Sequence, residues 1–359
     1  MTVTITDIAR RVGVSHPVVS KVLHGGKSNV GVSIALRSRI MQVATELDYR
    51  PNSASRALRS QRFGAVGILM GGSEDNVHLP QATLSSLTRT LSAHDQTCAL
   101  VCATLDPQKL TSTPLLRSRR LDVLIVSYTV AVPDELREAL TRLGLPLVWM
   151  HNLAPSDSVA LDERDACEQL VDHLADLGHK RLLFVDYSST LEAPSNRMRL
   201  SGLENACQRR SVDPSMMVTR RVPRHERFEA TKQWLTRRNR PRAVIANSMH
   251  TAEAILQSAL HLGLRVPQDL SIATFDDGTA HDVCIPRMTA VIAPQAALGQ
   301  AAADMALLKA ASPTKTLDNQ LLKFTLSVGA STARPGFAAA ATAPAFATES
   351  LSSSKSLAT

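Results

Sequence analysis

Residues 15–21, SHPVVSK, carry several side chains that could contact a nucleic acid. Lys21 can donate hydrogen bonds to guanine O6 or N7 in the major groove, whereas Pro17 offers only apolar contact. The hydroxyls of Ser15 and Ser20 are better suited to phosphate oxygens, which position a protein without reading the base sequence. His16 stands among these groups and would face the same partner. These residue types predict an interface that combines base contacts with phosphate contacts.

Positive charge is concentrated in the same part of the chain. Residues 1–62 hold ten lysines and arginines against three acidic residues, whereas the other residues hold thirty basic and twenty-nine acidic ones. A solvated charged surface is the simpler interpretation. A polyanionic partner explains better why the excess lies in one short segment.

An apolar pattern interrupted by a glycine predicts how these side chains are positioned. Apolar residues keep the 3.6-residue spacing of a helix on both sides of Gly13. Glycine adopts the positive φ of a tight turn without a Cβ penalty. Ser15 can then cap the second helix by accepting a hydrogen bond from the amide of Val18. We therefore predict a helix-turn-helix, with helices over residues 6–12 and 16–24, and keep a purely structural helix pair as the alternative.

A third helix is expected within residues 32–49, VSIALRSRIMQVATELDY, with Ser33 as its N-cap. It would close a small core through apolar residues at helical spacing: Leu36, Ile40, Val43, Ala44 and Leu47.

Residues 4–59 also carry a family resemblance. TITDIARRVGVSHPVVSKVLHG and TELDYRPNSASRAL resemble the DNA-binding headpiece and hinge of the LacI/GalR repressor family. The resemblance implies a hinge helix that folds on DNA and inserts the side chain of Leu58 into the minor groove, where an apolar wedge kinks the duplex. It adds Thr6, Asn52 and Ser55 to the residues expected to contact DNA.

From residue 63 onward, apolar runs of strand length alternate with helical patterns. The runs include AVGILM, TCALVCA, LDVLIVS, LPLVWM, RLLFVD, RAVIAN and DLSIATFD, and the helical stretches include 133–143, 163–177, 197–210, 225–238 and 249–262. This alternation predicts parallel sheets covered on both faces, arranged as two similar α/β subdomains. Ligands in such folds bind at the carboxyl ends of the strands.

The resemblance extends over this part. HLADLGHKRLLFV, LGLRVPQDLSIATFDD and IPRMTAV are similar to family motifs. They imply an α/β periplasmic-binding-protein-like core of two parallel-sheet subdomains, with a small effector, often a sugar, in the cleft. Arg199 matches a family arginine that holds the effector, and Asp276 and Asn247 match family pocket residues. Structural roles are the alternative: Asp276 as a cap after a strand, and Arg199 as a surface charge.

This sequence departs from the family pattern at the expected pocket. His151 and Ser248 stand where the family has acidic residues, and GGSEDNVHLPQ replaces a common family motif after the first strand. Aromatic residues make up only 3% of the chain, so stacking platforms for a sugar ring are scarce. We keep His151 among the expected effector-binding residues and expect a neutral or anionic effector.

These observations define four segments. They are a three-helix headpiece over 1–50, a hinge over 51–62, a two-lobed effector-binding and dimerisation domain over 63–336, and a disordered tail over 337–359, where 16 of 23 residues are Ala, Ser or Thr. No signal sequence or long apolar run is present, and the five cysteines form no CxxC pair. A cytoplasmic, nucleoid-associated location is therefore expected.

The expected function is transcriptional regulation, with repression as the default. A homodimer would bind palindromic operator DNA, and a small effector would control its affinity. Motifs for nucleophilic hydrolysis, phosphate-loop binding, dinucleotide binding and zinc hydrolysis are missing, so we expect no enzyme activity, no cofactor and no metal. Two alternatives remain: a solute-binding module with a vestigial headpiece, and an α/β enzyme fused to a DNA-binding arm.

Overall fold

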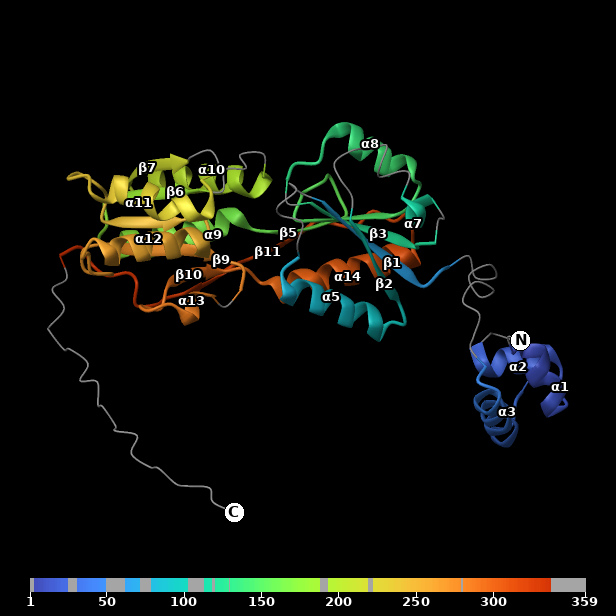
Figure 1. Cartoon of the computed structure of the whole chain (residues 1–359). Helices are drawn as coiled ribbons and strands as arrows, with labels where there is room; N and C mark the ends of the chain where they lie inside the picture. Colours follow the sequence, from blue (N-terminus) through green and yellow to red (C-terminus); the bar gives the residue numbers. More distant parts are fainter. Residues whose placement is uncertain are drawn as a thin grey trace, which may run out of the picture. The chain divides into compact units, whose positions relative to one another are not determined.

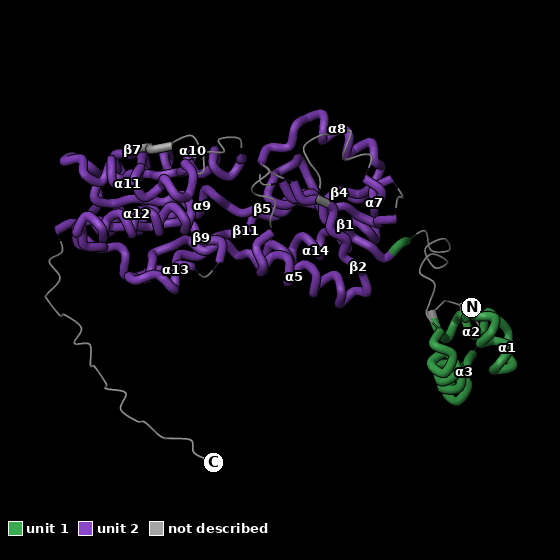
Figure 2. The backbone as a smooth tube through the Cα atoms, viewed as in Figure 1, with its two compact units in different colours: residues 1–63 green, residues 64–359 purple. Residues whose placement is uncertain are grey.

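A computed structural model describes residues 3–24, 31–49, 62–71, 79–102, 113–117, 120–128, 130–187, 193–218, 222–278 and 280–336. The chain divides into two compact units, residues 1–63 and residues 64–359, which Figure 2 shows in green and purple. The hinge residues Asn52, Ser55 and Leu58 and the tail at 337–359 lie outside the described residues.

The described part of the first unit contains three helices: α1 (Ile5–Val12), α2 (His16–His24) and α3 (Ile34–Glu46) (Figure 1). Gly13 ends α1 with a φ of +77°, and its amide donates to the carbonyl of Ala9 at 3.0 Å. The amide of Val18 donates to the main-chain carbonyl of Ser15 at 3.1 Å, where the sequence predicted the Ser15 hydroxyl as acceptor. The two predicted helices and the glycine turn between them are confirmed.

Side chains fix the other helix starts in this unit. Asp7 accepts hydrogen bonds from the amide and hydroxyl of Thr4 at 3.0 and 2.6 Å, which lower the pKa of its carboxyl. Ser33 caps α3 as predicted, because its hydroxyl accepts from the amide of Leu36 at 3.3 Å. Between the helices lies a small core of Ile8, Ala9, Val19, Val22, Ile40, Val43 and Ala44.

The second unit contains two six-stranded sheets. The first has the order β11-β5-β4-β3-β1-β2, and the second has the order β12-β10-β9-β8-β6-β7. The strands of the first sheet are β1 (Ala65–Gly71), β2 (Thr97–Cys102), β3 (Val123–Tyr128), β4 (Leu147–Met150), β5 (Ser158–Leu161) and β11 (Gln320–Leu322). Those of the second are β6 (Arg181–Asp186), β7 (Asp213–Val218), β8 (Ala243–Ala246), β9 (Ser271–Asp276), β10 (Thr289–Ile292) and β12 (Thr325–Ser327). All pairings are parallel except β10 with β12.

Each sheet carries helices and forms one lobe. The first lobe holds α5 (Gln81–Ala93), α7 (Pro114–Arg117), α8 (Asp134–Arg142) and α14 (Gln295–Ala311). The second holds α9 (Glu163–Asp176), α10 (Pro194–Arg209), η1 (Arg224–Glu226), α11 (Arg227–Leu235), α12 (Met249–His261) and α13 (Ala280–Val283). The chain crosses between the lobes three times, after β5, after β10 and after β11. The predicted two-subdomain parallel-sheet fold is confirmed.

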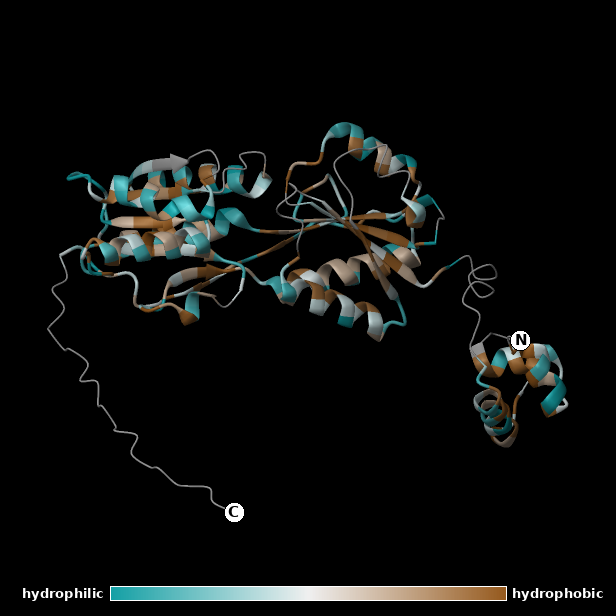
Figure 3. Cartoon of the chain, viewed as in Figure 1, coloured by the Kyte–Doolittle hydropathy of each residue, from teal (hydrophilic) through white to brown (hydrophobic). Residues whose placement is uncertain are grey.

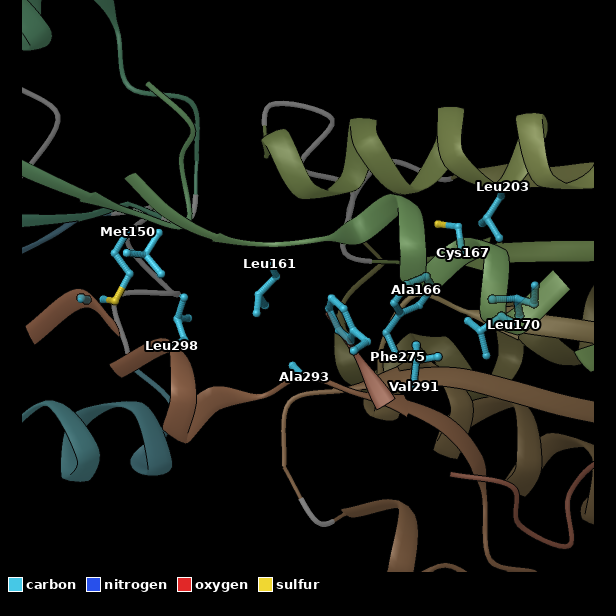
Figure 4. Close-up of a cluster of buried hydrophobic side chains, with 14 of the residues drawn as sticks. Met150, Leu161, Ala166, Cys167, Leu170, Leu203, Phe275, Val291, Ala293 and Leu298 are labelled. Carbon is cyan, nitrogen blue, oxygen red and sulfur yellow. The ribbon is translucent and has the colours of Figure 1, made fainter. Parts of the chain in front are cut away.

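Hydrophobic side chains explain this layering. Every residue of β3, β8 and β9 is buried, as expected for central strands covered on both faces. Figure 3 shows hydrophobic residues along the strands and hydrophilic ones on the outer faces of helices. One buried cluster continues between the lobes through Leu161 and Ala293, which lie on two of the crossing segments (Figure 4).

Some element boundaries differ from those expected. The helix expected over 197–210 begins at Pro194, because proline needs no amide partner in the first turn. The stretch expected as one helix over 225–238 is a 3-10 turn followed by α11. Within the described part of the chain, no helix has the length and apolar character needed to cross a membrane.

Candidate DNA interface and ligand cavity

A cavity of about 360 Å³ lies between the carboxyl ends of strands from both lobes. First-lobe residues reach it from the ends of β3 and β4 and from α8, and second-lobe residues from the start of α9, from α10 and from the end of β9. The polar lining residues are Tyr128, Arg137, His151, Asn152, Glu163, Ser195, Arg197, Arg199, Asp277 and Gln295. This is the position that the strand pattern predicted for a ligand.

Arg199 is the most heavily bonded side chain of the cavity wall. Its Nε and Nη2 donate to the carboxylate of Glu163 at 2.7 and 3.3 Å. Its Nη1 donates to the carbonyl and Oδ1 of Asn247 at 2.8 and 3.2 Å. The guanidinium also stacks on the ring of Phe275, 4.1 Å from the centroid. Since arginine has five N–H donors, only one, on Nη2, is left for a ligand.

Burial governs the electrostatics of this pair. Desolvation raises the pKa of Glu163, and the charge and hydrogen bonds of Arg199 oppose that effect. Desolvation acts to lower the pKa of Arg199, but the charge and hydrogen bonds of Glu163 outweigh it and the pKa is raised. Both side chains are almost inaccessible to solvent, with 11% and 6% of their surfaces exposed. Buried charges persist when they are paired and hydrogen-bonded, as here.

The two carboxylates at the end of β9 have different environments. Asp276 accepts hydrogen bonds from His281 Nδ1 at 2.7 Å and from the amides of Gly278 and His281, both at 3.1 Å. It therefore orders the turn into α13 and is not part of the cavity lining. The next residue, Asp277, lines the cavity and accepts from Gln295 Nε2 at 3.3 Å. Of the two adjacent aspartates, Asp277 therefore lines the cavity and Asp276 lies behind it, whereas sequence analysis expected Asp276 to contact the effector.

The other expected effector residues are also placed. His151 follows β4 with a φ of +71° and lines the cavity. Asn247 lies behind Arg199, where its Oδ1 accepts from Arg199 and its Nδ2 donates to Asn196 at 3.3 Å. Sequence reasoning missed Glu163, which starts α9, although an acidic residue after an apolar run was a visible signal. Among the described residues, no group of three or more His, Cys, Asp and Glu side chains is arranged to hold a metal ion.

The predicted DNA-contacting residues of the headpiece are accessible. Ser15, His16 and Pro17 are exposed around the start of α2, and Ser20 and Lys21 are half-buried one turn later. Thr6 is exposed in the first turn of α1. The start of α2 therefore presents the side chains that a recognition helix would direct into a major groove.

Comparison with known proteins identifies both units. Residues 4–52 match the model of bacterial regulatory proteins of the lacI family, and residues 171–332 match a periplasmic binding protein-like domain. The chain belongs to the lacI family. Like other members, it is a DNA-binding transcriptional regulator.

Family relatives align along most of the chain. Catabolite control protein A of Priestia megaterium is 27% identical over 332 residues, covering 90% of this chain and 96% of the relative. The lactose operon repressor of Escherichia coli (strain K12) is 25% identical over 347 residues, covering 93% of each protein.

Two solved structures share the fold of this chain. The lac repressor dimer bound to operator and the anti-inducer ONPF superposes with a TM-score of 0.77 at 23% identity, covering 93% of this chain and all of that one. The complex of the transcriptional regulator CelR with cellobiose superposes with a TM-score of 0.64 at 22% identity, covering 92% and 99%.

Proposed function

We propose that this lacI-family regulator represses transcription by binding a palindromic operator as a homodimer, and that a small effector in the cavity controls its operator affinity. The observation that carries the proposal is one cavity lined by side chains from both lobes. A ligand that contacts both lobes favours one arrangement of them over another. It changes DNA affinity by its preference between those states, typically by 1–3 kcal/mol in free energy.

The DNA contacts are assigned to the headpiece and the hinge. We propose base contacts for His16, Pro17 and Lys21 and phosphate contacts for Thr6, Ser15 and Ser20, in keeping with their exposure and chemistry. The hinge residues Asn52, Ser55 and Leu58 remain assigned from the resemblance alone.

The effector contacts are assigned to His151, Asp277 and the remaining N–H of Arg199. Asn247 and Asp276 act one step away from the ligand, by fixing Arg199 and the loop that carries Asp277. The first crossing segment leads from β5 into α9, which begins at Glu163, the partner of Arg199, so a change in lobe arrangement would reach this pair through the backbone.

We further infer that the cavity binds its ligand without converting it, and that the protein acts in the cytoplasm at the nucleoid. In support, Glu163 and Arg199 are committed to each other by two hydrogen bonds, so that neither is available as an acid or a base.

The test uses purified full-length protein and a duplex from the region upstream of its own gene. Binding is measured by fluorescence anisotropy, first alone and then with metabolites that raise the thermal stability of the protein. Binding that responds to a stabilising metabolite supports the proposal. A protein that binds metabolites but no duplex would be a solute-binding module, and turnover of a metabolite would indicate an enzyme.

Lys21→Ala provides a test at the level of the DNA interface. If Lys21 contacts a guanine, the variant should lose about 1–3 kcal/mol of binding free energy on the cognate duplex and discriminate less at one base pair of each half-site. Anisotropy titrations on single-base variants of the duplex measure both effects. An equal loss on all sequences, with the salt slope reduced by about one, would assign Lys21 to a phosphate instead.

A further inference from the structure

We propose that the cavity binds a ligand with an anionic group, a carboxylate or a phosphate, held between the guanidinium groups of Arg137 and Arg197, while the hydroxyl of Tyr128 donates a hydrogen bond to the same ligand. This inference rests on the proposed function, because the ligand is taken to be the effector.

The charges of the cavity wall favour an anion. Its described lining contains three arginines and two carboxylates. Glu163 is paired with Arg199. Asp277 therefore faces the charges of two further arginines, and the cavity keeps an excess of positive charge that an anionic ligand would neutralise.

The two remaining arginines come from opposite lobes. Arg137, on α8, donates from Nε to the carbonyl of Val132 at 3.3 Å and lies over the ring of Trp149, 4.8 Å from the centroid. Arg197, on α10, is exposed. Neither the Nη atoms of Arg137 nor the guanidinium of Arg197 has a hydrogen-bond or ion-pair partner within the described parts of the chain. Guanidinium groups bind carboxylates and phosphates through paired hydrogen bonds, which gives both arginines a chemical use.

Tyr128 supplies an independent indication of a missing ligand. It ends β3, lines the cavity and is fully buried, yet its hydroxyl has no hydrogen-bond partner among the described residues. Folded proteins pair almost all buried hydroxyls, because an unpaired one loses its hydration without compensation. Burial raises the pKa of Tyr128 to about 12, so the phenol stays protonated at neutral pH and can donate to an anionic oxygen.

Neutral and cationic ligands fit this cavity less well. A neutral ligand would leave the excess positive charge of the cavity uncompensated, and a cation would add to it. Tyr128 is the one Phe, Tyr or Trp among the described lining residues, and its ring packs so closely on Gly71 that a Cβ there would overlap it. The packed face is therefore not open for stacking on a sugar ring.

The first experiment compares ligands that share one skeleton and differ in charge. D-gluconate, D-glucitol 6-phosphate, D-glucitol and D-glucamine are titrated against the full chain at constant ionic strength, with inorganic phosphate as a further probe. Both tryptophans of the chain, Trp149 and Trp234, lie in the second unit, so the thermal unfolding seen by their fluorescence reports on the core alone. We expect saturable stabilisation by an anionic probe and none by glucitol or glucamine. Whether gluconate or glucitol 6-phosphate binds more tightly then shows whether the cavity prefers a carboxylate or a phosphate. Equal stabilisation by glucitol, or none by any anion, would overturn the inference.

Variants then locate the binding. Arg137→Gln and Arg197→Gln should each lower the affinity for the stabilising probe at least tenfold. Arg197→Gln should do so without changing the melting temperature of the free protein, because the Arg197 guanidinium has no partner among the described residues. Arg142→Gln is the matched control, because Arg142 lies on the same helix as Arg137 and pairs with Glu138 on the surface. Probe affinity that falls equally in all three variants would contradict the assignment.

The two buried tyrosines provide the last comparison. The hydroxyl of Tyr187, 1% exposed, lies 2.9 Å from Thr231 Oγ1 and accepts from Trp234 Nε1 at 2.8 Å. Tyr187→Phe should therefore lower the melting temperature of the free protein. Tyr128→Phe should leave that temperature unchanged or raise it, and should lower the affinity for the probe at least fivefold. Destabilisation by Tyr128→Phe with unchanged probe affinity would overturn the role of Tyr128. Duplex binding measured on the same samples separates this outcome from failure of the proposed function.

Discussion

At the residue scale, Arg199 divides its donors unequally between structure and ligand. Four of its five N–H groups are used by Glu163 and Asn247, and its flat face covers Phe275. Its main role is therefore to hold α9, α10 and the end of β8 together at the cavity. A loss of effector response in an arginine variant would not by itself identify a ligand contact.

Arg199→Leu should be strongly destabilising, because it leaves the carboxylate of Glu163 buried without a counter-charge. We expect a loss of about 3–5 kcal/mol in the free energy of unfolding, measured by urea denaturation. The double variant Glu163→Met with Arg199→Leu should recover most of that loss, since apolar groups can replace a buried pair. Arg142→Leu, which breaks an exposed pair with Glu138, should cost less than about 1 kcal/mol. Equal effects of the two single variants would contradict this account.

Residue types predicted the cavity only in part. Arg199 and His151 both line it, Arg199 at a position that matches a family arginine and His151 at a position where the family has an acidic residue. That Asp277 and not Asp276 lines the cavity was not predictable, since adjacent aspartates look alike in sequence and the hydrogen bonds of His281 and Gly278 to Asp276 decide which one turns inward. Glu163 and Arg199 are 36 positions apart on two different helices, so no local pattern in the sequence indicates that they pair.

At the element scale, α5 and α14 lie side by side on the first lobe (Figure 1). Their close approach depends on Gly299, where an added Cβ would overlap the main chain of Thr83. Thr83 also donates from its hydroxyl to Gln295 Oε1 at 2.6 Å, and Gln295 contacts Asp277 at the cavity. The ligand cavity and α5 are thus joined by two hydrogen bonds.

Gly299→Ala should separate these two helices. We expect a loss of about 1–3 kcal/mol in the free energy of unfolding, the usual cost of overpacking, because the new methyl meets rigid backbone. Gly278→Ala is the control, since Gly278 has nothing within 4 Å of its Cβ position. Urea denaturation measures both. A Gly299→Ala variant as stable as the control would show that the helices can move apart freely.

Most long strands and helices were predictable because fully buried strands form uninterrupted apolar runs and helices keep their period, but α5, α14 and β7 were not among the segments named from the sequence. The short strands β11 and β12 were not predictable, because each has three residues, none of them buried. Their positions are set by pairing with β5 and β10, and both pairings join segments that are far apart in the sequence.

Two histidines that contact the C-terminal segment should make the stability of the protein depend on pH. His179 Nε2 lies 2.9 Å from the carbonyl of Ala333, and His173 Nε2 lies 2.9 Å from Thr332 Oγ1. Burial lowers the pKa of both histidines from the usual value of 6.5. As the pH falls below about 6.5, the unfolded chain binds protons that the folded chain does not, so the stability that is complete above that pH declines.

His179→Gln should flatten this decline. The free energy of unfolding, measured by denaturation at intervals between pH 7.5 and 5, should fall less steeply in the variant than in the parent. His225→Gln, at an exposed position, serves as the control. Parallel curves for parent and His179→Gln would assign the pH dependence to other groups.

At the scale of the whole molecule, the two units have separate cores. The headpiece cluster contains only residues from α1 to α3 and their connections, and the clusters of the second unit contain none of them. Each unit therefore holds the hydrophobic contacts that it needs to fold.

The intact chain should unfold in two transitions in scanning calorimetry. Ile40→Ala should reduce the free energy of unfolding of the headpiece by about 2–5 kcal/mol. The temperature of the headpiece transition should fall, and that of the core transition should not change. Val291→Ala should do the reverse, because Val291 is buried in the cluster that joins the lobes. A single transition shifted by both substitutions would show that the units unfold together.

The three crossings between the lobes also have a consequence for synthesis on the ribosome. The first lobe needs α14 and β11, which end at Ala311 and Leu322, and the second needs β12. The headpiece is complete when α3 ends at Glu46. At translation rates of about 5–20 residues per second, the last strand of the first lobe follows roughly 14–55 s later. During that interval a finished headpiece leads a nascent chain in which neither lobe is complete, so premature termination would release a folded headpiece without an effector cavity.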